Sequence, residues 1–432
     1  MKQNLLTGFL LLLALSSFAQ QIAGLQYYDQ QASDGYTLLG PLSSTDTYLI
    51  NNCGKVVHKW QSNRLPANEV KLLPNGWLLR CEELENEMIE AGGGGGMVSI
   101  YDQNSEIIWE YEVNNDTLRQ HHDATMLPNG NILILTWKRH SLNDAIEAGR
   151  DTTLLRDASL WSEVIIEVKP EFPEGGSIVW LWDSWDHHVQ NYDPEKLNYG
   201  DVAQPGKINL NFNADSGAED WIHANGFDYN EALDQIILSS RTFSEVWIID
   251  HSTTTLEARG SVGGNFGKGG DLLYRWGNPV AYEAGELADQ QLFNQHNPNW
   301  VTNTSFFQDG ITIFNNNNTF PNGSFYSSVV IITPSIENNT YSTENSRFLP
   351  AAPEYMYTRE GFLSRFISGA EVLENGHILV CSGAQGHIFE LNQEKEIVWS
   401  YINPVTANGI YNRDLFLSSG ENINRNTMFR AH

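Results

Sequence analysis

Basic residues are scarce in this chain of 432 residues. It contains 25 Lys and Arg against 53 Asp and Glu, which gives a formal net charge of −28. An acidic excess of this size repels polyanions and favours solubility, and no stretch of the chain forms a basic arm. Nucleic acid and anionic membrane surfaces are therefore not expected as partners.

Cysteine is nearly absent. The three cysteines, Cys53, Cys81 and Cys381, are an odd number, and none belongs to a C-x-x-C pair. In an oxidising compartment one pair can be bridged, but the sequence does not choose which. A structural thiol or a single disulfide is the plain interpretation, and a zinc or redox site is the alternative.

Long apolar runs are missing except at the N-terminus. The run from Leu5 to Leu15 follows the positive Lys2 and precedes the small residues Ser17 and Ala19. This pattern predicts a secretory signal peptide over residues 1–20. A membrane anchor is the alternative, but the run is shorter than the roughly 20 residues that span a bilayer. We expect residues 21–432 to form one exported catalytic domain, periplasmic or secreted, with no membrane span.

What the chain has in abundance is one repeated pattern. Aromatic residues are plentiful, with 13 Trp, 17 Tyr and 19 Phe, so a large core can be buried. A polar turn followed by an apolar strand recurs, and Asn-Gly or Asp-Gly between alternating apolar residues is a strong signal for tight antiparallel turns. The recurring segments are Val70–Arg80, Thr125–Leu135, Asp228–Ser240, Phe306–Asn316 and Glu371–Cys381.

Each of these segments is followed by a strand, a turn and a further strand that carries Trp, as in SIYDQNSEIIWEYEV and IFELNQEKEIVWSYINP. About four strands per unit predict an all-β protein with the architecture of a β-propeller. A lone outer pattern, Thr47–Trp60, lacks an inner strand, and the tail Thr427–Ala431 is left to supply it. We therefore predict six blades, in a ring that N- and C-terminal strands close within one blade.

The alternatives to six blades are an open sandwich and a seven-bladed ring. Seven blades require that the insertions at His140–Asp157 or Asp186–Asn213 hide strands. Connections as long as Arg139–Leu160 and Trp185–Ala218 are usually functional lids or binding walls. The five glycines Gly92–Gly96 lack a following Lys or helix signature and are interpreted as a hairpin tip or loop.

Three histidines occupy equivalent positions in successive repeats. His122, His223 and His296 each stand seven residues before a turn asparagine, namely Asn129, Asn230 and Asn303. Because the first strand of each blade lines the central channel, side chains at matched positions converge on the axis. A single histidine here is more often structural, but three at matched positions indicate a functional site.

Two chemistries fit three convergent histidines. One is a zinc or iron centre, with Asp123 as the candidate carboxylate. The other is group transfer, in which a neutral imidazole is the nucleophile and Arg241, with the other histidines, holds an anionic group. Arg241 favours group transfer, because a permanent cation repels a metal ion but binds an oxyanion well.

The motifs HHDATMLPNGN, WIHANGFDYNEALDQIILSSR and the QH of LFNQHNPNW resemble those of the bacterial arylsulfate sulfotransferases. These are exported six-bladed propellers that need no nucleotide sulfate donor. The resemblance extends from Gly35 to the tail.

The resemblance implies ping-pong transfer of a sulfuryl group from a phenolic sulfate ester to a second phenol, with no cofactor and no metal. His296 is the implied nucleophile. His122, or its neighbour His121, together with His223 and Arg241, is expected to bind the sulfate oxygens and assist the departing phenolate. Asn225 is expected to add a polar contact to the substrate.

A neutral imidazole nucleophile needs an acceptor for its other ring nitrogen, and the sequence names none for His296. A metal- or quinone-dependent propeller oxidoreductase stays open as an alternative, although no Trp-docking repeat typical of quinoproteins is recognised. A non-catalytic propeller that binds glycans or protein partners also stays open. Trp221, Trp300 and Phe243 near the expected mouth suit a phenolic ring, a sugar or the core.

Overall fold

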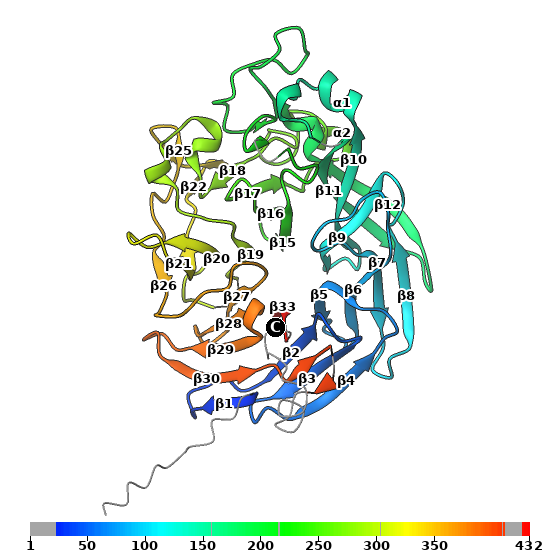
Figure 1. Ribbon diagram of the computed structural model, residues 1–432, viewed down its shortest axis with the longest axis vertical. Coiled ribbons are helices and arrows are strands. Elements are labelled where there is room, and N and C mark those ends of the chain that lie inside the picture. The colour runs from blue at the N-terminus through cyan, green and yellow to red at the C-terminus, as the bar shows by residue number, and fades with distance from the viewer. Residues whose placement is uncertain (1–22, 157, 215–216, 303, 408, 411–425) are drawn as a thin grey trace, which may run out of the picture.

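Six antiparallel sheets surround one axis in the computed structural model, which confirms the predicted six-bladed propeller (Figure 1). The structure describes residues 23–156, 158–214, 217–302, 304–407, 409–410 and 426–432. The predicted signal peptide and the turn residue Asn303 lie outside these ranges.

The blades are numbered in chain order, and their strands are given from the axis outward. Blade 1 consists of β33 (Met428–Ala431), β2 (Tyr36–Pro41), β3 (Asp46–Asn51) and β4 (Val56–Gln61). Blade 2 consists of β5 (Pro66–Leu72), β6 (Leu78–Glu83), β7 (Gly96–Tyr101) and β8 (Ile107–Glu112). Blade 3 consists of β9 (Leu118–Met126), β10 (Ile132–Ser141), β11 (Ser159–Pro170) and β12 (Gly176–Asp183).

The second half of the ring repeats this order. Blade 4 consists of β15 (Ala224–Asn230), β16 (Gln235–Ser240), β17 (Glu245–Asp250) and β18 (Tyr274–Trp276). Blade 5 consists of β19 (His296–Trp300), β20 (Ile311–Thr319), β21 (Phe325–Ile332) and β26 (Tyr355–Tyr357). Blade 6 consists of β27 (Gly369–Val372), β28 (Ile378–Ser382), β29 (His387–Leu391), β30 (Ile397–Ile402) and β1 (Gly24–Tyr28).

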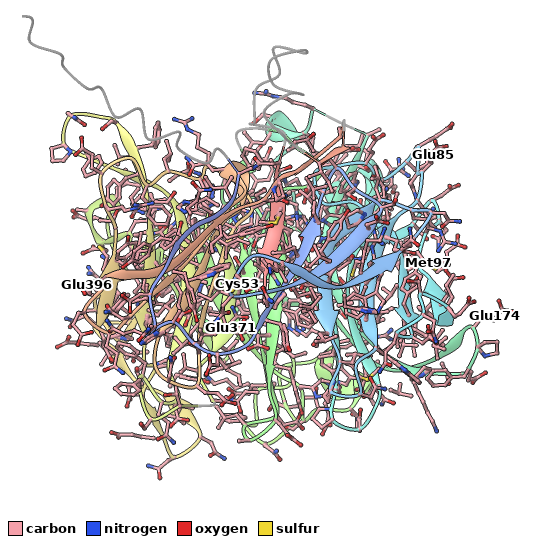
Figure 2. All side chains as sticks on the ribbon, turned by 90° about the horizontal axis from the view of Figure 1, so that it is seen from below. Cys53, Glu85, Met97, Glu174, Glu371 and Glu396 are labelled. Atoms are coloured by element: carbon pink, nitrogen blue, oxygen red, sulfur yellow. The ribbon has the colours of Figure 1, made fainter. Side chains whose placement is uncertain are left out.

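Both ends of the described chain close the ring. The tail strand β33 pairs with β2, with Leu39 opposite Ala431 and Pro41 opposite Met428, as the sequence predicted. The N-terminal strand β1 joins β30 as a fifth, outermost strand of blade 6, which the sequence analysis did not anticipate. Paired edges remove the open hydrogen-bonding rows that invite aggregation. Figure 2 shows the red strand β33 inside the disc, while Glu174 and Glu396 lie at its rim.

The middle strands are apolar along most of their length because both of their faces are covered. Every residue of β16 and of β17 is buried, since each blade packs between two others. A short continuous apolar run bounded by turn signals is the pattern expected for such a strand. The tight turns that connect first and second strands use glycine with positive φ, +82° at Gly76 and +84° at Gly130, where glycine has no steric penalty.

Tryptophans on the outer strands tie four of the six blades to the blade that follows. In four blades an indole N–H donates to a backbone carbonyl of the following blade, at 2.7–2.9 Å. The pairs are Trp109 with Gly175, Trp182 with Gly270, Trp276 with Pro350 and Trp399 with Asn52. The sequence indicated strands that carry Trp but not this contact, because the acceptor lies on a separate blade.

The insertions add short elements but no seventh blade among the described residues. Arg139–Leu160 holds α1 (Leu142–Glu147), which Ser141 and Asp144 cap in a capping box. Trp185–Ala218 holds the parallel pair β13 (His188–Val189) and β14 (Ile208–Asn209). The remaining short elements are α2 (Thr255–Ala258), β22 (Ile336–Glu337), β23 (Thr340–Tyr341), β24 (Thr343–Glu344), β25 (Arg347–Phe348), β31 (Val405–Thr406) and β32 (Gly409–Ile410).

The three cysteines are all free thiols, with Cys53 exposed and the other two buried. Burial raises the pKa of Cys381 to about 12, so this thiol stays protonated and packs as a small apolar side chain. The single disulfide that the sequence left open is not formed. Within the described ranges, no helix is long and apolar enough to cross a membrane.

The indole contacts between blades can be tested with Trp109→Phe. The substitution removes the N–H that binds the carbonyl of Gly175, and a lost buried hydrogen bond costs about 1–3 kcal/mol. Urea unfolding should show a loss of unfolding free energy in this range. The control is Trp60→Phe, because the equally buried indole nitrogen of Trp60 has no hydrogen-bond partner in the described part of the chain. Equal losses in the two variants would contradict a role for the interblade bond.

Candidate active site

The predicted histidines lie at irregular points of the innermost strands. The ladder between β9 and β10 slips between Ile134 and Thr136, so that His121, His122 and Asp123 bulge out. Similar slips occur at the starts of β15 and β19. His122 has φ of +53° and His223 has φ of +49°. Bulges and left-handed residues re-aim side chains, and histidine tolerates this region better than most residues.

The bulges bring His122 and His223 together across two blades, while His296 lies on a third. The rings of His122 and His223 stand edge to face with their centroids 5.1 Å apart. Phe429 of β33 lies between His122 and His296. Its ring centroid is 5.8 Å from that of His122 and 6.5 Å from that of His296. Phe429 of the closing strand therefore contacts two of the three predicted histidines, and the third, His223, contacts His122.

His122 and its neighbour His121 have different surroundings. His121 stacks on Trp137 at 3.9 Å and stands 3.0 Å from a carboxylate oxygen of Glu163. His122 contacts His223, so it is the member of the pair on the side of the other site residues. The Nδ1 atoms of the two histidines are 2.8 Å apart, so one of them donates and the other accepts. Burial, reinforced by the neighbouring histidines, lowers the pKa of His122 well below its usual value.

The glycine run Gly92–Gly96 forms part of the wall around His122. The carbonyl of Gly93 accepts the backbone N–H of His122 at 2.9 Å. A Cβ atom at Gly93 would lie 2.2 Å from atoms of the His122 ring, which no side chain could tolerate. Residues 92–95 form a loop and Gly96 begins β7, and the lack of side chains lets the backbone approach the imidazole.

His296 is held by polar partners on both ring nitrogens. Nδ1 lies 2.8 Å from Oδ1 of Asn316, and the backbone N–H of Ile367 donates to Nε2 at 3.1 Å. The amide nitrogen of Asn316 donates to the carbonyls of Ser364 and Ile367, which fixes its oxygen toward His296. Both partners therefore require the neutral tautomer with the proton on Nδ1 and a lone pair on Nε2.

Asn316 is the acceptor that the sequence analysis could not name. It lies in β20, twenty residues after His296, within the run Asn315–Asn318. Four consecutive asparagines in a strand of a buried sheet were the available signal, but only the pairing of β19 with β20 shows which of them faces the imidazole. Burial lowers the pKa of His296 well below its usual value, and the charge of Arg241 lowers it further.

Arg241 contributes a cation without a partner. It follows β16, and its backbone N–H donates to the carbonyl of His223 at 3.2 Å. Its guanidinium makes no hydrogen bond or ion pair with any residue in the described ranges. Asp220 binds Nδ1 of His223 at 2.5 Å, and it stands only three residues before that histidine, where the sequence analysis overlooked it. An unpaired guanidinium beside two oriented imidazoles is suited to an anionic group.

The floor of the site is an ion-pair cluster that the sequence analysis missed. Arg430 of β33 binds Glu69 at 2.5 Å and Asp123 at 2.8 Å, and it donates to the carbonyl of Asn225 at 3.2 Å. Asp123 also binds Lys71 at 3.1 Å. The predicted carboxylate of a metal site is therefore engaged by two cations. Among the described residues, no three His, Cys, Asp or Glu side chains are arranged to hold one metal ion.

Asn225, the predicted accessory contact, lies beside this floor. Its amide nitrogen donates to the carbonyl of Gln295 at 2.8 Å, while its Oδ1 is buried with no hydrogen-bond partner among the described residues. The predicted mouth aromatics are placed differently. Trp221, Phe243 and Trp300 all belong to the apolar core, and Trp300 also lines a separate cavity with Lys71 and His432.

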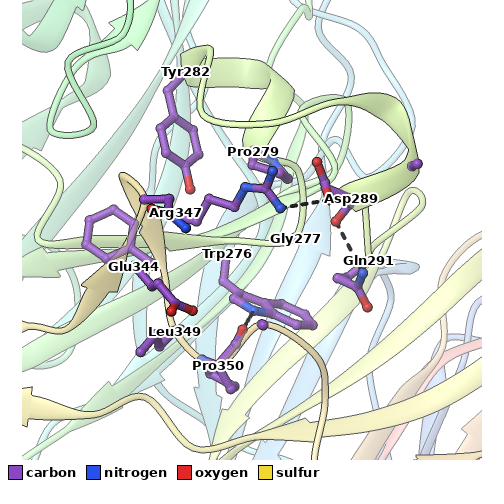
Figure 3. A pocket seen from close by; sticks show the side chains of 14 residues that line it. Trp276, Gly277, Pro279, Tyr282, Asp289, Gln291, Glu344, Arg347, Leu349 and Pro350 are labelled. Atoms are coloured by element: carbon purple, nitrogen blue, oxygen red, sulfur yellow. Dashed lines mark hydrogen bonds and ion pairs between the residues drawn. The ribbon is translucent and has the colours of Figure 1, made fainter.

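A second cavity, of about 230 Å³, lies away from the histidines (Figure 3). Trp276 of the outer strand β18 and the blade 5 loop at Pro350 form its walls. An ion pair between Arg347 and Asp289, at 2.7 Å, crosses it. These charges neutralise each other, and none of the predicted site residues lies there.

Comparison with known proteins identifies the family of this chain. The sequence profile of the arylsulfotransferase (ASST) family matches residues 42–412. The chain belongs to the arylsulfotransferase family. All of the predicted site residues fall within the matched region. A comparison with curated protein sequences finds no match for this arylsulfotransferase.

Solved structures similar to this arylsulfotransferase share little sequence with it. A Bacteroides caccae protein of unknown function is 12% identical with a TM-score of 0.45, covering 85% of this chain and 94% of its own. The periplasmic gluconolactonase of Pseudomonas aeruginosa is 10% identical with a TM-score of 0.43, covering 86% and 97%. Virginiamycin B lyase of Staphylococcus aureus is 12% identical with a TM-score of 0.40, covering 90% and 87%. Likenesses this distant carry no argument about activity.

The contribution of the Arg430 ion pairs to stability can be tested with Arg430→Met. Removing one member of a buried ion pair typically costs about 3–5 kcal/mol, because the partner charges stay buried. Burial alone would raise the pKa of Glu69, but the charges of Arg430, Lys71 and His432 outweigh it and lower that pKa to about 2.

A carboxyl group whose pKa is lowered by folding stabilises the fold at pH values above its ordinary pKa. This stabilisation is lost as the pH falls toward the pKa of the group in the folded protein. The wild type should therefore lose unfolding free energy between about pH 4.3 and pH 2. The difference between wild type and Arg430→Met should shrink over the same window, as measured by chemical unfolding. A difference that is constant with pH would contradict this coupling.

Proposed function

We propose that this arylsulfotransferase moves a sulfuryl group from a phenolic sulfate ester to a second phenol through a sulfohistidine on His296. The observation that carries the proposal is the fixed state of this imidazole. Asn316 and Ile367 both require a lone pair on Nε2, and the unpaired cation of Arg241 is close enough to lower the pKa of the ring. A neutral nucleophile beside an anion-binding group is what attack on a sulfate ester needs.

In the first half-reaction, Nε2 of His296 attacks the sulfur of the ester. The bond between sulfur and the phenolic oxygen breaks, and the oxygen leaves with the electron pair as a phenolate. Arg241 compensates the charge on the sulfuryl oxygens, and a fixed cation of this kind supplies much of the acceleration in group transfer. The product is a sulfuryl group bonded to Nε2.

The second half-reaction is the reverse of the first, with a second phenol as the acceptor. The acceptor loses its proton, its oxygen attacks sulfur, and the bond from sulfur to Nε2 breaks. His122 and His223 are the candidates for accepting this proton, since their Nε2 atoms have no hydrogen-bond partner in the described residues. His121 orients His122, and Asn225 adds a polar contact to the substrate.

We further propose that the protein works after export, in the periplasm or outside the cell, with residues 1–20 as the removed signal. The support for export is the apolar run Leu5–Leu15 between Lys2 and the small residues Ser17 and Ala19. The partners are then small phenolic donors and acceptors, with no metal and no cofactor.

The activity is tested with p-nitrophenyl sulfate, with and without phenol, while nitrophenolate and intact protein mass are followed. We expect release that phenol stimulates, and a protein carrying one added sulfuryl group in the absence of acceptor. His296→Ala should lose both signals, with a fall in kcat of at least about 10³-fold. His377→Ala is the control, because this histidine pairs with Glu390 on blade 6. Release that no acceptor influences would indicate a hydrolase instead.

The pH dependence of adduct formation follows from the lowered pKa of His296. Because the folded pKa lies well below 6.5, the imidazole stays neutral, and Nε2 keeps its lone pair, as the pH falls through 6.5. The rate of formation of the sulfuryl enzyme, measured by rapid quench and mass spectrometry, should therefore stay level between pH 7.5 and pH 5.5. A tenfold fall centred near pH 6.5 would show an ordinary imidazole nucleophile and contradict the burial argument.

A further inference from the structure

The turn before β27 holds a residue in an unfavourable backbone conformation. Ile367 has φ of +51° and Ser368 has φ of +91°. A β-branched residue at positive φ is a genuine outlier, because its side chain crowds the backbone there. Such outliers persist only where the surroundings impose them, and they cluster at functional sites.

Contacts from three blades impose this conformation. Asn316 of blade 5 donates to the carbonyls of Ser364 and Ile367, at 2.8 and 2.9 Å. The backbone N–H of Ser368 donates to the carbonyl of Phe429 in blade 1, at 2.9 Å. Within blade 6, the hydroxyl of Ser368 bonds to that of Ser364 at 2.8 Å and accepts the N–H of Gly383 at 3.0 Å.

This arrangement directs the backbone N–H of Ile367 at the imidazole of His296. The N–H of Ile367 points at Nε2 of His296 with a nitrogen-to-nitrogen distance of 3.1 Å. Both groups are buried, so the donor is shielded from water. Asn316 alone would suffice to hold the tautomer of the imidazole, so the strained donor on Nε2 calls for a separate explanation.

We propose that the backbone N–H of Ile367 is an oxyanion donor for the sulfuryl group carried on Nε2 of His296. This inference rests on the proposed function and adds a catalytic group to it. Sulfur bonds to Nε2 on the side where this N–H lies, so the N–H and the ring must separate as the bond forms, and the donor then faces the sulfuryl oxygens. Preorganised donors of this kind stabilise charge as it develops in the transition state.

The exchange of bonds balances. As the aryl sulfate approaches, the hydrogen bond from Ile367 to Nε2 breaks and Nε2 uses its lone pair to bond to sulfur. The bond from sulfur to the phenolic oxygen breaks, and that oxygen leaves with the electron pair. The freed N–H then donates to a nonbridging sulfuryl oxygen. Transfer to the acceptor phenol returns the lone pair to Nε2 and the hydrogen bond to its starting state.

The decisive experiment replaces Ile367 by its α-hydroxy acid in the full-length protein, which turns the amide into an ester and removes only the N–H. With p-nitrophenyl sulfate, we expect the first-turnover burst of nitrophenolate to slow by roughly 10²-fold, with KM little changed. The matched control is the same replacement at the exposed residue Glu394, in the turn between β29 and β30, which should react like the wild type.

A second variant separates the N–H from the side chain. Ile367→Gly keeps the donor and relieves the strain, since glycine adopts positive φ freely. It should retain most of the burst rate, although the loss of the buried isoleucine side chain lowers its melting temperature. A burst rate in the ester protein equal to that of the wild type overturns the proposal, as does a rise in KM with kcat unchanged, which would show a merely structural role.

If the ester variant does not fold, the proposal can still be tested by a measurement on the wild-type protein. Hydrogen exchange of the Ile367 amide should stay slow in the sulfuryl enzyme, because the N–H remains bonded to a sulfuryl oxygen. Fast exchange in that state would overturn the assignment. If the wild type forms no sulfuryl adduct at all, the proposed function itself fails, and this inference fails with it.

Discussion

The ion pairs of Arg430 at the propeller axis are the contacts on which the rest of the site depends. Arg430 belongs to β33, so the strand that closes the ring also places a cation between Glu69 and Asp123. Two buried carboxylates on neighbouring blades would repel each other without it. The same strand positions Phe429 between His122 and His296, and Phe429 also holds the turn of Ile367.

Burial and positive charge together keep the imidazoles of His122 and His296 neutral. The pKa values of His122 and His296 are lowered first by burial and then by neighbouring histidines and Arg430. A neutral ring has one proton and one lone pair, so its direction must be set by partners. Asn316 sets it for His296, Asp220 binds His223, and His121 binds His122. Each reactive ring therefore has its own polar support, which lies outside the predicted set except for His121.

The blades keep this arrangement rigid by two means. The apolar middle strands pack between neighbouring sheets, and the outer tryptophans add directed bonds from one blade to the next. The irregular backbone is confined to the axial ends of the inner strands, where bulges and positive φ values aim His122, His223 and the N–H of Ile367. The regular outer parts of the blades thus hold the strained residues near the axis in the conformations that the site requires.

The sequence by itself determined the six blades, the closing tail strand and the three histidines, because these rest on turns and strand patterns that repeat along the chain. Asp220 and the wall formed by Gly92–Gly96 also left local signals that could have been interpreted further. The partners Asn316, Arg430 and Ile367 were decided only by the tertiary structure. They reach the site from 20, 134 and 71 residues beyond His296, and nothing local in a sequence records which strand will pair beside another.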